Sequence, residues 1–351
     1  IRLMAIIDKP SDYFNTKLYT GTGSSQSITG VGFQPDLVWI KSRNDTGNHN
    51  LFDVVRGTTK YLKSNATNAE STDSTSLTSF DSDGFTLGSN TDQDVNKNNI
   101  NHVAWNWKAG TSFTNDASAT GIGSIDSTGS VNTTSGFSII SYTGTGSAAT
   151  VAHGLGVTPK VVMVKNLENA TDWGVYNSNL TNANYLLYIN LTHAETNQSS
   201  NFGTAPTSSV FTVNTNNSTN QSGLNHIAYC FNDVQGYSKF GSYVGNGSTD
   251  GTFVYTGFSP AFVMVKRTNG ANSWNIKDNR RNNASTSFNI NPRNATLLPN
   301  DSAADQDANA LDFLSNGFKN RSTGNDANNA SGTYIYMAFA ENPLVASNFV
   351  P

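Results

Sequence analysis

Charged side chains are scarce in this sequence. Asp, Glu, Lys and Arg together make up 13% of its 351 residues, about half of the share that is usual in soluble proteins. No run of Lys and Arg occurs, and the formal net charge is −4. Proteins that bind nucleic acid usually carry a basic stripe that neutralises phosphates. We therefore expect no nucleic-acid partner.

Cysteine and long apolar runs are also scarce. Cys230 is the single cysteine, so no disulfide can form within the chain. It lies in an apolar, strand-like run and is interpreted as a small buried side chain. No stretch approaches the roughly 20 apolar residues of a membrane-spanning helix, and the first residues lack a signal-peptide pattern. The sequence therefore predicts that the protein does not insert into a membrane. It also predicts synthesis in the cytoplasm without a leader.

Asn, Ser, Thr and Gly take the place of the missing charges. Ser, Thr and Asn disfavour helices because their side chains hydrogen-bond to nearby backbone groups. Short apolar runs alternate with clusters of these polar residues, which is typical of strands joined by turns. Asp83-Gly84 and Asn316-Gly317 each lie between two such runs and predict hairpins. The expected fold class is all-β, with antiparallel sandwiches.

One strand-like stretch occurs three times. The copies read GFQPDLVWIKSRND at 32–45, GVTPKVVMVKNLEN at 156–169 and GFSPAFVMVKRTNG at 257–270. An aromatic turn, YTGTGS or YVGNGS, precedes each copy, and a lysine ends each apolar run. Another strand recurs later in each copy, as NHVAWNWK, NHIAYCFN and TYIYMAFA. Such self-similarity indicates tandem structural modules.

The repeats predict three tandem antiparallel β-sandwich modules of the jelly-roll or lectin-like kind. Their predicted boundaries are residues 1–110, 136–235 and 236–351, and each module has about the length of one small sandwich. Residues 111–135 are rich in Gly, Ser and Thr and predict a linker or a long surface loop. The lysine-terminated strands are too uniformly apolar to have a solvent face, so we expect them in the middle of a sandwich.

Signatures of catalysis are missing from the sequence. It contains no nucleophile elbow, phosphate-binding loop, zinc-protease motif or dinucleotide fingerprint. His102 and His226 occupy equivalent repeat positions, where the third module has Tyr334. A structural role therefore fits these residues better than acid–base chemistry, and we predict no catalytic residue. A glycan-cleaving enzyme remains an alternative, although no pair of acids stands out for that chemistry.

Aromatic residues are the best candidates for ligand binding. Trp173 and Trp274 lie at the same repeat position, eight residues after the lysine, and His49 takes this position in the first module. An exposed ring could stack on a sugar, and abundant amides could add hydrogen bonds. The alternative is packing in the sandwich core. We name these three as candidate ligand-binding residues, with polysaccharide as the candidate ligand.

Acidic clusters supply candidate metal ligands. Carboxylates recur with calcium-like spacing in FDSDGF, NTDQD and NDSAADQD. The last cluster gives the candidate site Asp301, Asp305 and Asp307, and the middle one contains Asp92 and Asp94. None matches a full calcium-binding loop. The expectation is a protein without a cofactor, with calcium as the alternative.

The sequence resembles structural proteins of marine tailed bacteriophages. The resemblance rests on MAIIDKPSDYFNTKLYTGTGSSQSITGVGFQPDLVWIKSR, LFDVVRG, NHVAWNWKAG and GTYIYMAFAENP and covers essentially the whole chain. In that family such modules recur in tandem and are described as tail-fibre-like or virion proteins. Some are compared with concanavalin-like or SPRY-like sandwiches.

The resemblance implies a non-enzymatic virion protein on the particle surface, a fibre or surface appendage. It would act in assembly and in attachment to host-surface glycans. The implied partners are other virion proteins, further copies of the same chain in a homo-oligomer, and host polysaccharide. A capsid decoration or another purely structural subunit without a ligand is the alternative.

Overall fold

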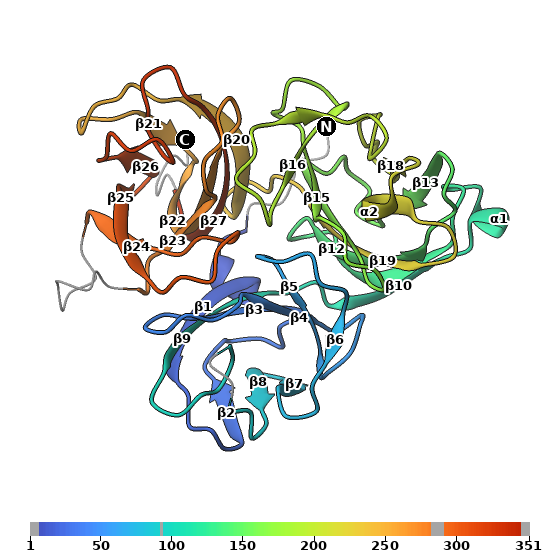
Figure 1. The fold of residues 1–351 in the computed structure, drawn as a ribbon, viewed down its shortest axis with the longest axis horizontal. Helices are drawn as coiled ribbons and strands as arrows, with labels where there is room; N and C mark the ends of the chain where they lie inside the picture. Colours follow the sequence, from blue (N-terminus) through green and yellow to red (C-terminus); the bar gives the residue numbers. More distant parts are fainter. Residues whose placement is uncertain (1–6, 92–93, 282–290, 345–351) are drawn as a thin grey trace, which may run out of the picture.

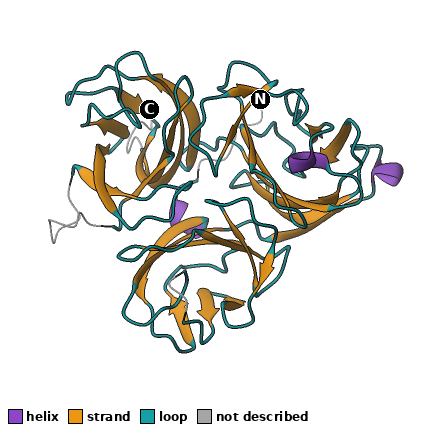
Figure 2. Ribbon diagram, in the orientation of Figure 1, coloured by secondary structure: helices purple, strands orange, loops and turns teal. Residues whose placement is uncertain are grey.

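The computed structural model describes residues 7–91, 94–281 and 291–344. Nearly all its regular structure is β, which confirms the predicted all-β class (Figure 2). The helices in the described residues are the single turns η1 (Pro10–Asp12), α1 (Ala117–Thr120) and α2 (Asn217–Asn220). None of the helices in this described part has the length and apolar character needed to cross a bilayer.

The strands form antiparallel sheets that group into three pairs, one pair for each repeat (Figure 1). In the first module the large sheet has the order β1 (Phe14–Thr20), β9 (Asn101–Trp107), β3 (Leu37–Ser42), β4 (Asn50–Asp53), β5 (Lys60–Lys63), β6 (Ser71–Thr72). Its small sheet has the order β2 (Gln26–Thr29), β8 (Gly84–Leu87), β7 (Leu77–Asp81).

The second and third modules repeat this plan. The second large sheet has the order β10 (Thr111–Asn115), β11 (Ser127–Asn132), β12 (Phe137–Thr143), β19 (Asn225–Phe231), β14 (Val161–Asn166), β15 (Gly174–Asn177), β16 (Tyr185–Tyr188), β17 (Thr196–Asn197), and its small sheet is β13 (Ala149–Ala152) with β18 (Val210–Val213). The third large sheet has the order β20 (Ser238–Val244), β27 (Thr333–Pro343), β22 (Phe258–Arg267), β23 (Asn275–Asp278). Its small sheet has the order β21 (Phe253–Tyr255), β26 (Gly317–Asn320), β25 (Gln306–Leu314), β24 (Arg293–Thr296).

The two predicted hairpins are confirmed. Asp81 pairs with Gly84 where β7 meets β8, and Leu314 pairs with Gly317 where β25 meets β26. Gly84 has a φ of 148°, and a Cβ there would lie 1.9 Å from the carbonyl oxygen of Ile28. The glycine therefore serves both the turn and the close approach of the neighbouring strand β2.

The repeated strands β3, β14 and β22 are buried on both faces. In β3, Val38 and Ile40 pack toward the small sheet of their own module. Leu37 and Trp39 alternate with them and point to the opposite face. The same alternation occurs in β14 and β22. Burial on two sides explains why these strands carry no polar face.

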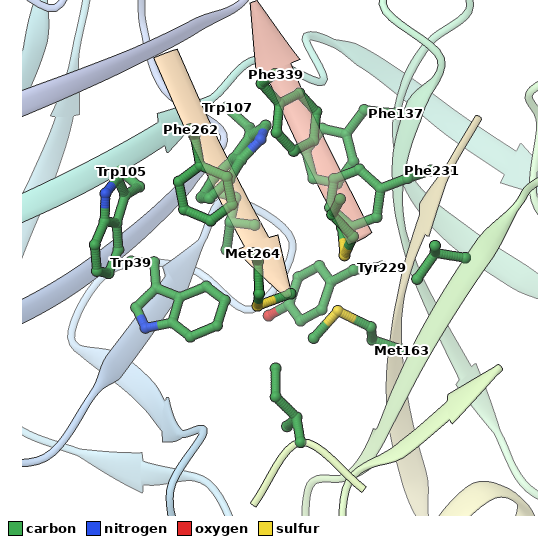
Figure 3. Close-up of a cluster of buried hydrophobic side chains, with 14 of the residues drawn as sticks. Trp39, Trp105, Trp107, Phe137, Met163, Tyr229, Phe231, Phe262, Met264 and Phe339 are labelled. Carbon is green, nitrogen blue, oxygen red and sulfur yellow. The ribbon is translucent and has the colours of Figure 1, made fainter. Parts of the chain in front are cut away.

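The second face of each large sheet meets the other two large sheets in a central hydrophobic cluster (Figures 1 and 3). Trp107 from the first module lies edge-to-face against Phe262 and Phe339 from the third, with ring centroids 5.7 and 5.6 Å apart. Phe231 from the second module contacts Phe339 in the same way at 5.9 Å. The three modules therefore share one core.

Residues 111–135, predicted as a linker or a long surface loop, are instead part of the second large sheet. β10 pairs with β11, and β11 pairs with β12 along its whole length. Ile125 bridges to Val151 and is buried. The composition was misleading because Ser and Thr suit the solvent face of a strand as well as a loop.

Candidate functional site

The three candidate ligand-binding residues are buried, with exposed fractions of 0% for His49, 0% for Trp173 and 2% for Trp274. They lie between modules. Trp173 donates its Nε1–H to the backbone carbonyl of Lys63 in the first module at 2.9 Å. Trp274 donates to the carbonyl of Tyr188 in the second module, also at 2.9 Å. These rings therefore offer no open platform for a sugar.

His49 extends this series to the third boundary. It accepts a hydrogen bond from Trp39 Nε1 at 2.9 Å and stacks on Trp105 with centroids 6.3 Å apart. Burial lowers the pKa of His49 well below its usual value, and nearby cations lower it further. A backbone interaction with Leu298 of the third module opposes this shift, although Nε2 has no partner within ordinary hydrogen-bond geometry. The imidazole is therefore neutral at neutral pH.

Equivalent backbone hydrogen bonds cross all three boundaries. The backbone N–H of Glu70 donates to the carbonyl of Leu167 at 2.7 Å, that of Glu195 to Thr268 at 2.8 Å, and that of Asp305 to Arg43 at 2.7 Å. Each acceptor lies two residues after the repeated lysine. The first module thus contacts the second, the second contacts the third, and the third returns to the first. We call this closed, buried region where the three large sheets meet the joint.

A buried ion pair stabilises the first module's side of the joint. Arg56 Nε donates to Asp53 Oδ2 at 2.5 Å, and Arg56 Nη2 donates to the Leu51 carbonyl at 2.7 Å. Tyr229 of the second module donates its hydroxyl to the same Asp53 oxygen at 2.7 Å. Glu70 places a further carboxylate 3.4 Å from the guanidinium. Several partners for each charge are what a buried ion pair requires.

The third module repeats this arrangement. Arg281 donates its Nε–H to Asp278 Oδ2 at 2.6 Å and its Nη1–H to Asp305 at 2.5 Å. Trp105 of the first module donates its Nε1–H to Asp278 Oδ2 at 3.0 Å, and the guanidinium lies over its ring. Burial alone would raise the pKa of Asp278, but the charge and hydrogen bonds of Arg281 lower it below its usual value.

The remaining boundary has no equivalent ion pair among its described residues. Asn177 takes the place of the aspartate, Leu180 that of the arginine and Met337 that of the ring donor. Glu195, which would face the missing arginine, binds the backbone N–H and hydroxyl of Thr181 instead. All three changes occur together, so no buried charge is left without a partner there.

The three repeated lysines are buried at the ends of their strands. Their Nζ atoms form no ion pair with any described residue and instead donate to backbone carbonyls. Lys41, Lys165 and Lys266 each donate to the carbonyl of the next residue in the chain, Ser42, Asn166 and Arg267, at 2.7, 2.9 and 2.9 Å. Burial lowers the three pKa values to about 8, 8 and 7. A lysine with a lowered pKa can act as a nucleophile, but these side chains are closed to substrate and fasten the loop that follows.

The candidate metal ligands do not converge on one site. Asp305 belongs to the joint, where Arg281 binds it. Asp301 accepts a backbone N–H two residues further on, and Asp307 lies on β25. In the described residues, no group of three or more His, Cys, Asp or Glu side chains is arranged to hold a metal ion. Asp92 lies outside the described residues.

The repeated histidines have a structural position. The stacked ring pairs are His102 on Tyr19, His226 on Tyr142 and Tyr334 on Tyr243, with centroids 5.0, 5.2 and 5.0 Å apart. Each pair fastens the aromatic turn to the strand beside it. Burial lowers the pKa of His226 to about 4. A tyrosine replaces the histidine in the third module because a flat ring is what the position needs.

Exposed aromatic rings were missed in the sequence. Phe253 and Tyr255 are 44% and 59% exposed on the edge strand β21, on either side of buried Val254. The alternation of ring, Val and ring is a period-two signal that could have identified them. The exposed positions of β2, the corresponding strand of the first module, carry Ser27 and Thr29 instead.

One known protein family matches nearly the whole chain, including all the residues of the joint. A family model described as a domain of unknown function, DUF7483, matches residues 9–343. The chain belongs to the DUF7483 family. Because the match spans all three sheet pairs, the DUF7483 domain is the whole closed arrangement rather than one repeat. Searches of curated proteins and of solved structures gave no significant match.

Proposed function

We propose that this DUF7483 protein is a non-enzymatic structural protein of a bacteriophage particle, a fibre or surface appendage. The observation that carries the proposal is the use of its reactive side chains. The lysines with lowered pKa, the neutral His49 and both Asp–Arg pairs are all buried in or beside the joint. They hold the modules together or fasten loops beside the joint, and they are closed to any substrate. The resemblance to phage structural proteins supplies the viral part.

The physical character of the surface supports the same proposal. Exposed charge is sparse, so surface ion pairs contribute little and their screening by salt costs little. The stability of the chain depends instead on a core shared by three modules. A part on the outside of a particle needs this tolerance of changing salt. Its partners in the proposal are other virion proteins and further copies of the same chain.

Attachment to host polysaccharide is a second part of the proposal, and the exposed rings Phe253 and Tyr255 favour it. The corresponding strands of the first and second modules, β2 and β13, carry no aromatic ring. Among these three strands, the exposed rings therefore occur only on β21 of the third module. A glycan array with the whole chain tests this part. The double variant Phe253→Ser/Tyr255→Thr, which copies β2, should lose binding. If the double variant bound glycans as well as wild type does, the attachment site would not include Phe253 and Tyr255.

Locating the protein tests the main proposal. Gold-labelled antibodies on purified phage particles should mark the particle surface, and host polysaccharide incubated with the protein should release no reducing ends. Absence of the protein from purified particles would refute the structural role. Release of reducing ends by the purified chain would favour the glycan-cleaving alternative.

A further inference from the structure

A small polar cavity lies in the first module, between the large sheet and the chain segments that follow β6 and β8. Its accessible volume is about 20 Å³, enough for one water molecule or one small ion. The polar residues that line it are Asn50, Asp73, Ser76, Asn90 and Asp94. They come from three separate stretches of the chain.

The two carboxylates that line the cavity form no ion pair with any described residue. Asp73 accepts from the N–H and hydroxyl of Thr75 at 2.8 and 2.7 Å, and from Asn90 Nδ2 at 2.5 Å. Asp94 accepts from the N–H and Nδ2 of Asn48 at 2.6 and 3.0 Å. A carboxylate has about four acceptor positions, so both groups retain capacity for another partner.

Asn50 brings a third oxygen to the same place. Its side chain is 1% exposed, and its Oδ1 is buried with no hydrogen-bond partner in the described part of the chain. An amide oxygen buried without a partner is rare in folded proteins because it has lost its hydration. An occupant of the cavity would supply the missing interaction.

The third module contains the same pair of positions. Asn275 and Asp326 correspond there to Asn50 and Asp94. In both modules the carboxylate accepts the backbone N–H of the residue two places before the asparagine, at 2.6 Å in the first module and 3.1 Å in the third. The two sites are therefore built on the same backbone geometry and differ in what lies between amide and carboxylate.

In the third module a side-chain NH₂ group fills that place. Asn309 Nδ2 donates to Asn275 Oδ1 at 2.9 Å and lies 3.5 Å from Asp326 Oδ2. Asn275 directs its own NH₂ group to the backbone carbonyls of Ser273 and Asp326, which fixes its oxygen toward Asn309. The occupant between amide oxygen and carboxylate is thus a positively polarised group. In the first module no described side chain bridges Asn50 and Asp94.

We propose that the first module binds a divalent cation, Ca²⁺, in this cavity. Asp73 and Asp94 supply carboxylate oxygens and Asn50 supplies an amide oxygen, the hard ligands that Ca²⁺ takes, with water completing its coordination. The cation does the work of the Asn309 amide in the third module and ties the segments after β6 and β8 to β4. The second module has Gly174 and Ser218 at the two positions and lacks this donor set.

Calorimetric titration of the chelator-treated whole chain with Ca²⁺ tests the proposal. One binding event is expected, and Ca²⁺ at a hundredfold excess over Kd should raise Tm by about 3 to 4 °C. Asp94→Asn should weaken binding at least ~10-fold. The matched control Asp326→Asn alters the equivalent carboxylate of the third module and should leave the Ca²⁺ affinity unchanged.

Tb³⁺ luminescence gives a readout that does not depend on stability. Tb³⁺ occupies calcium sites and emits when a nearby aromatic ring is excited, and Tyr61 lines the cavity. Emission is expected from wild type and from Asp326→Asn, to be displaced by Ca²⁺, and to be lost in Asp94→Asn. Two results would overturn the proposal in favour of a bound water molecule. The first is wild-type protein that releases or absorbs no heat on addition of Ca²⁺ and gives no Tb³⁺ emission. The second is an Asp94→Asn variant that binds Ca²⁺ as tightly as wild type does.

Discussion

Single residues in the joint show two ways of filling the same buried position. Asp53 with Arg56 and Asp278 with Arg281 are ion pairs whose side chains are almost fully buried. Taking one member out of such a pair leaves a buried charge, whereas replacing both by neutral groups of similar size often costs little. Asn177, with an apolar residue three places later, is the neutral solution within the same chain. The repeat therefore provides its own control for the energetic role of the ion pairs.

Arg281→Met is expected to lower the free energy of unfolding by about 3 to 5 kcal/mol, because Asp278 stays buried without its partner. The double variant Asp278→Asn/Arg281→Leu copies the second module and is expected to lose less. Asp305 keeps Arg43 as its partner in both variants. Urea unfolding of the three proteins measures the difference. A double variant that is less stable than the single one would contradict this account.

Because Lys266 is buried, we expect the free energy of unfolding to rise with pH. The pKa of Lys266 falls from 10.5 in the unfolded chain to about 7 in the folded one because of burial. Between these values the unfolded chain binds more protons, so the free energy of unfolding increases with pH. Lys266 alone should contribute roughly 2 kcal/mol from pH 7 to 9, and Lys41 and Lys165 act in the same direction. Urea unfolding at pH 7, 8 and 9 gives the free energy of unfolding at each pH. This free energy should rise less steeply with pH for Lys266→Met than for wild type. An equal rise in the two proteins would contradict the role given to Lys266.

At the scale of elements, β10 and β11 illustrate how a weakly apolar segment becomes structural. They extend the second large sheet by two strands beyond β12. Their side chains are mostly Ser, Thr, Asn and Gly, but Val131 and the nearby Ile125 are buried against the small sheet. Without them, the full length of β12 would be an open edge, and open edges favour pairing with other chains.

Replacing residues 111–132 by a Gly/Ser chain of equal length is expected to destabilise the protein. The loss from Ile125 and Val131 alone is roughly 3 to 6 kcal/mol, since each buried aliphatic side chain contributes about 1.5 to 3 kcal/mol. Thermal unfolding measures the loss, and light scattering detects pairing through the exposed β12. Unchanged stability and solubility would mean that the segment acts only as a linker.

At the scale of the whole molecule, the central cluster makes the modules interdependent. In the described residues, one face of every large sheet packs against the other modules in the central cluster (Figure 3). A module removed from the chain would expose that face, including Met163, Tyr229 and Phe231 in the second module. Apolar patches of this kind lead to association in water. The repeats therefore behave as parts of one domain.

Calorimetry should accordingly show a single unfolding transition for the whole chain, with equal calorimetric and van't Hoff enthalpies. Residues 136–235 expressed alone should aggregate, whereas the whole chain stays soluble under the same conditions. Three separable transitions, or a soluble and folded isolated module, would show that the shared core contributes little to stability.

The sequence by itself determined the all-β class of this protein and several of its elements, although not the strands within residues 111–135. Turn residues such as Asp83-Gly84 and the period-two alternation act locally, so they indicated the hairpins and the all-β class. The repeat placed His49, Trp173 and Trp274 at one equivalent position. These signals are local or internal to the chain, and no partner surface is needed to interpret them.

Only the tertiary structure decided which faces are covered. A tryptophan that faces a sugar and one that faces another module have the same local sequence, so Trp173 and Trp274 looked like surface candidates. The tertiary structure also placed Asn50, Asp73 and Asp94, which are far apart in the chain, around one cavity. Burial and charge pairing depend on contacts between distant segments, and in this protein those contacts run between as well as within the three modules.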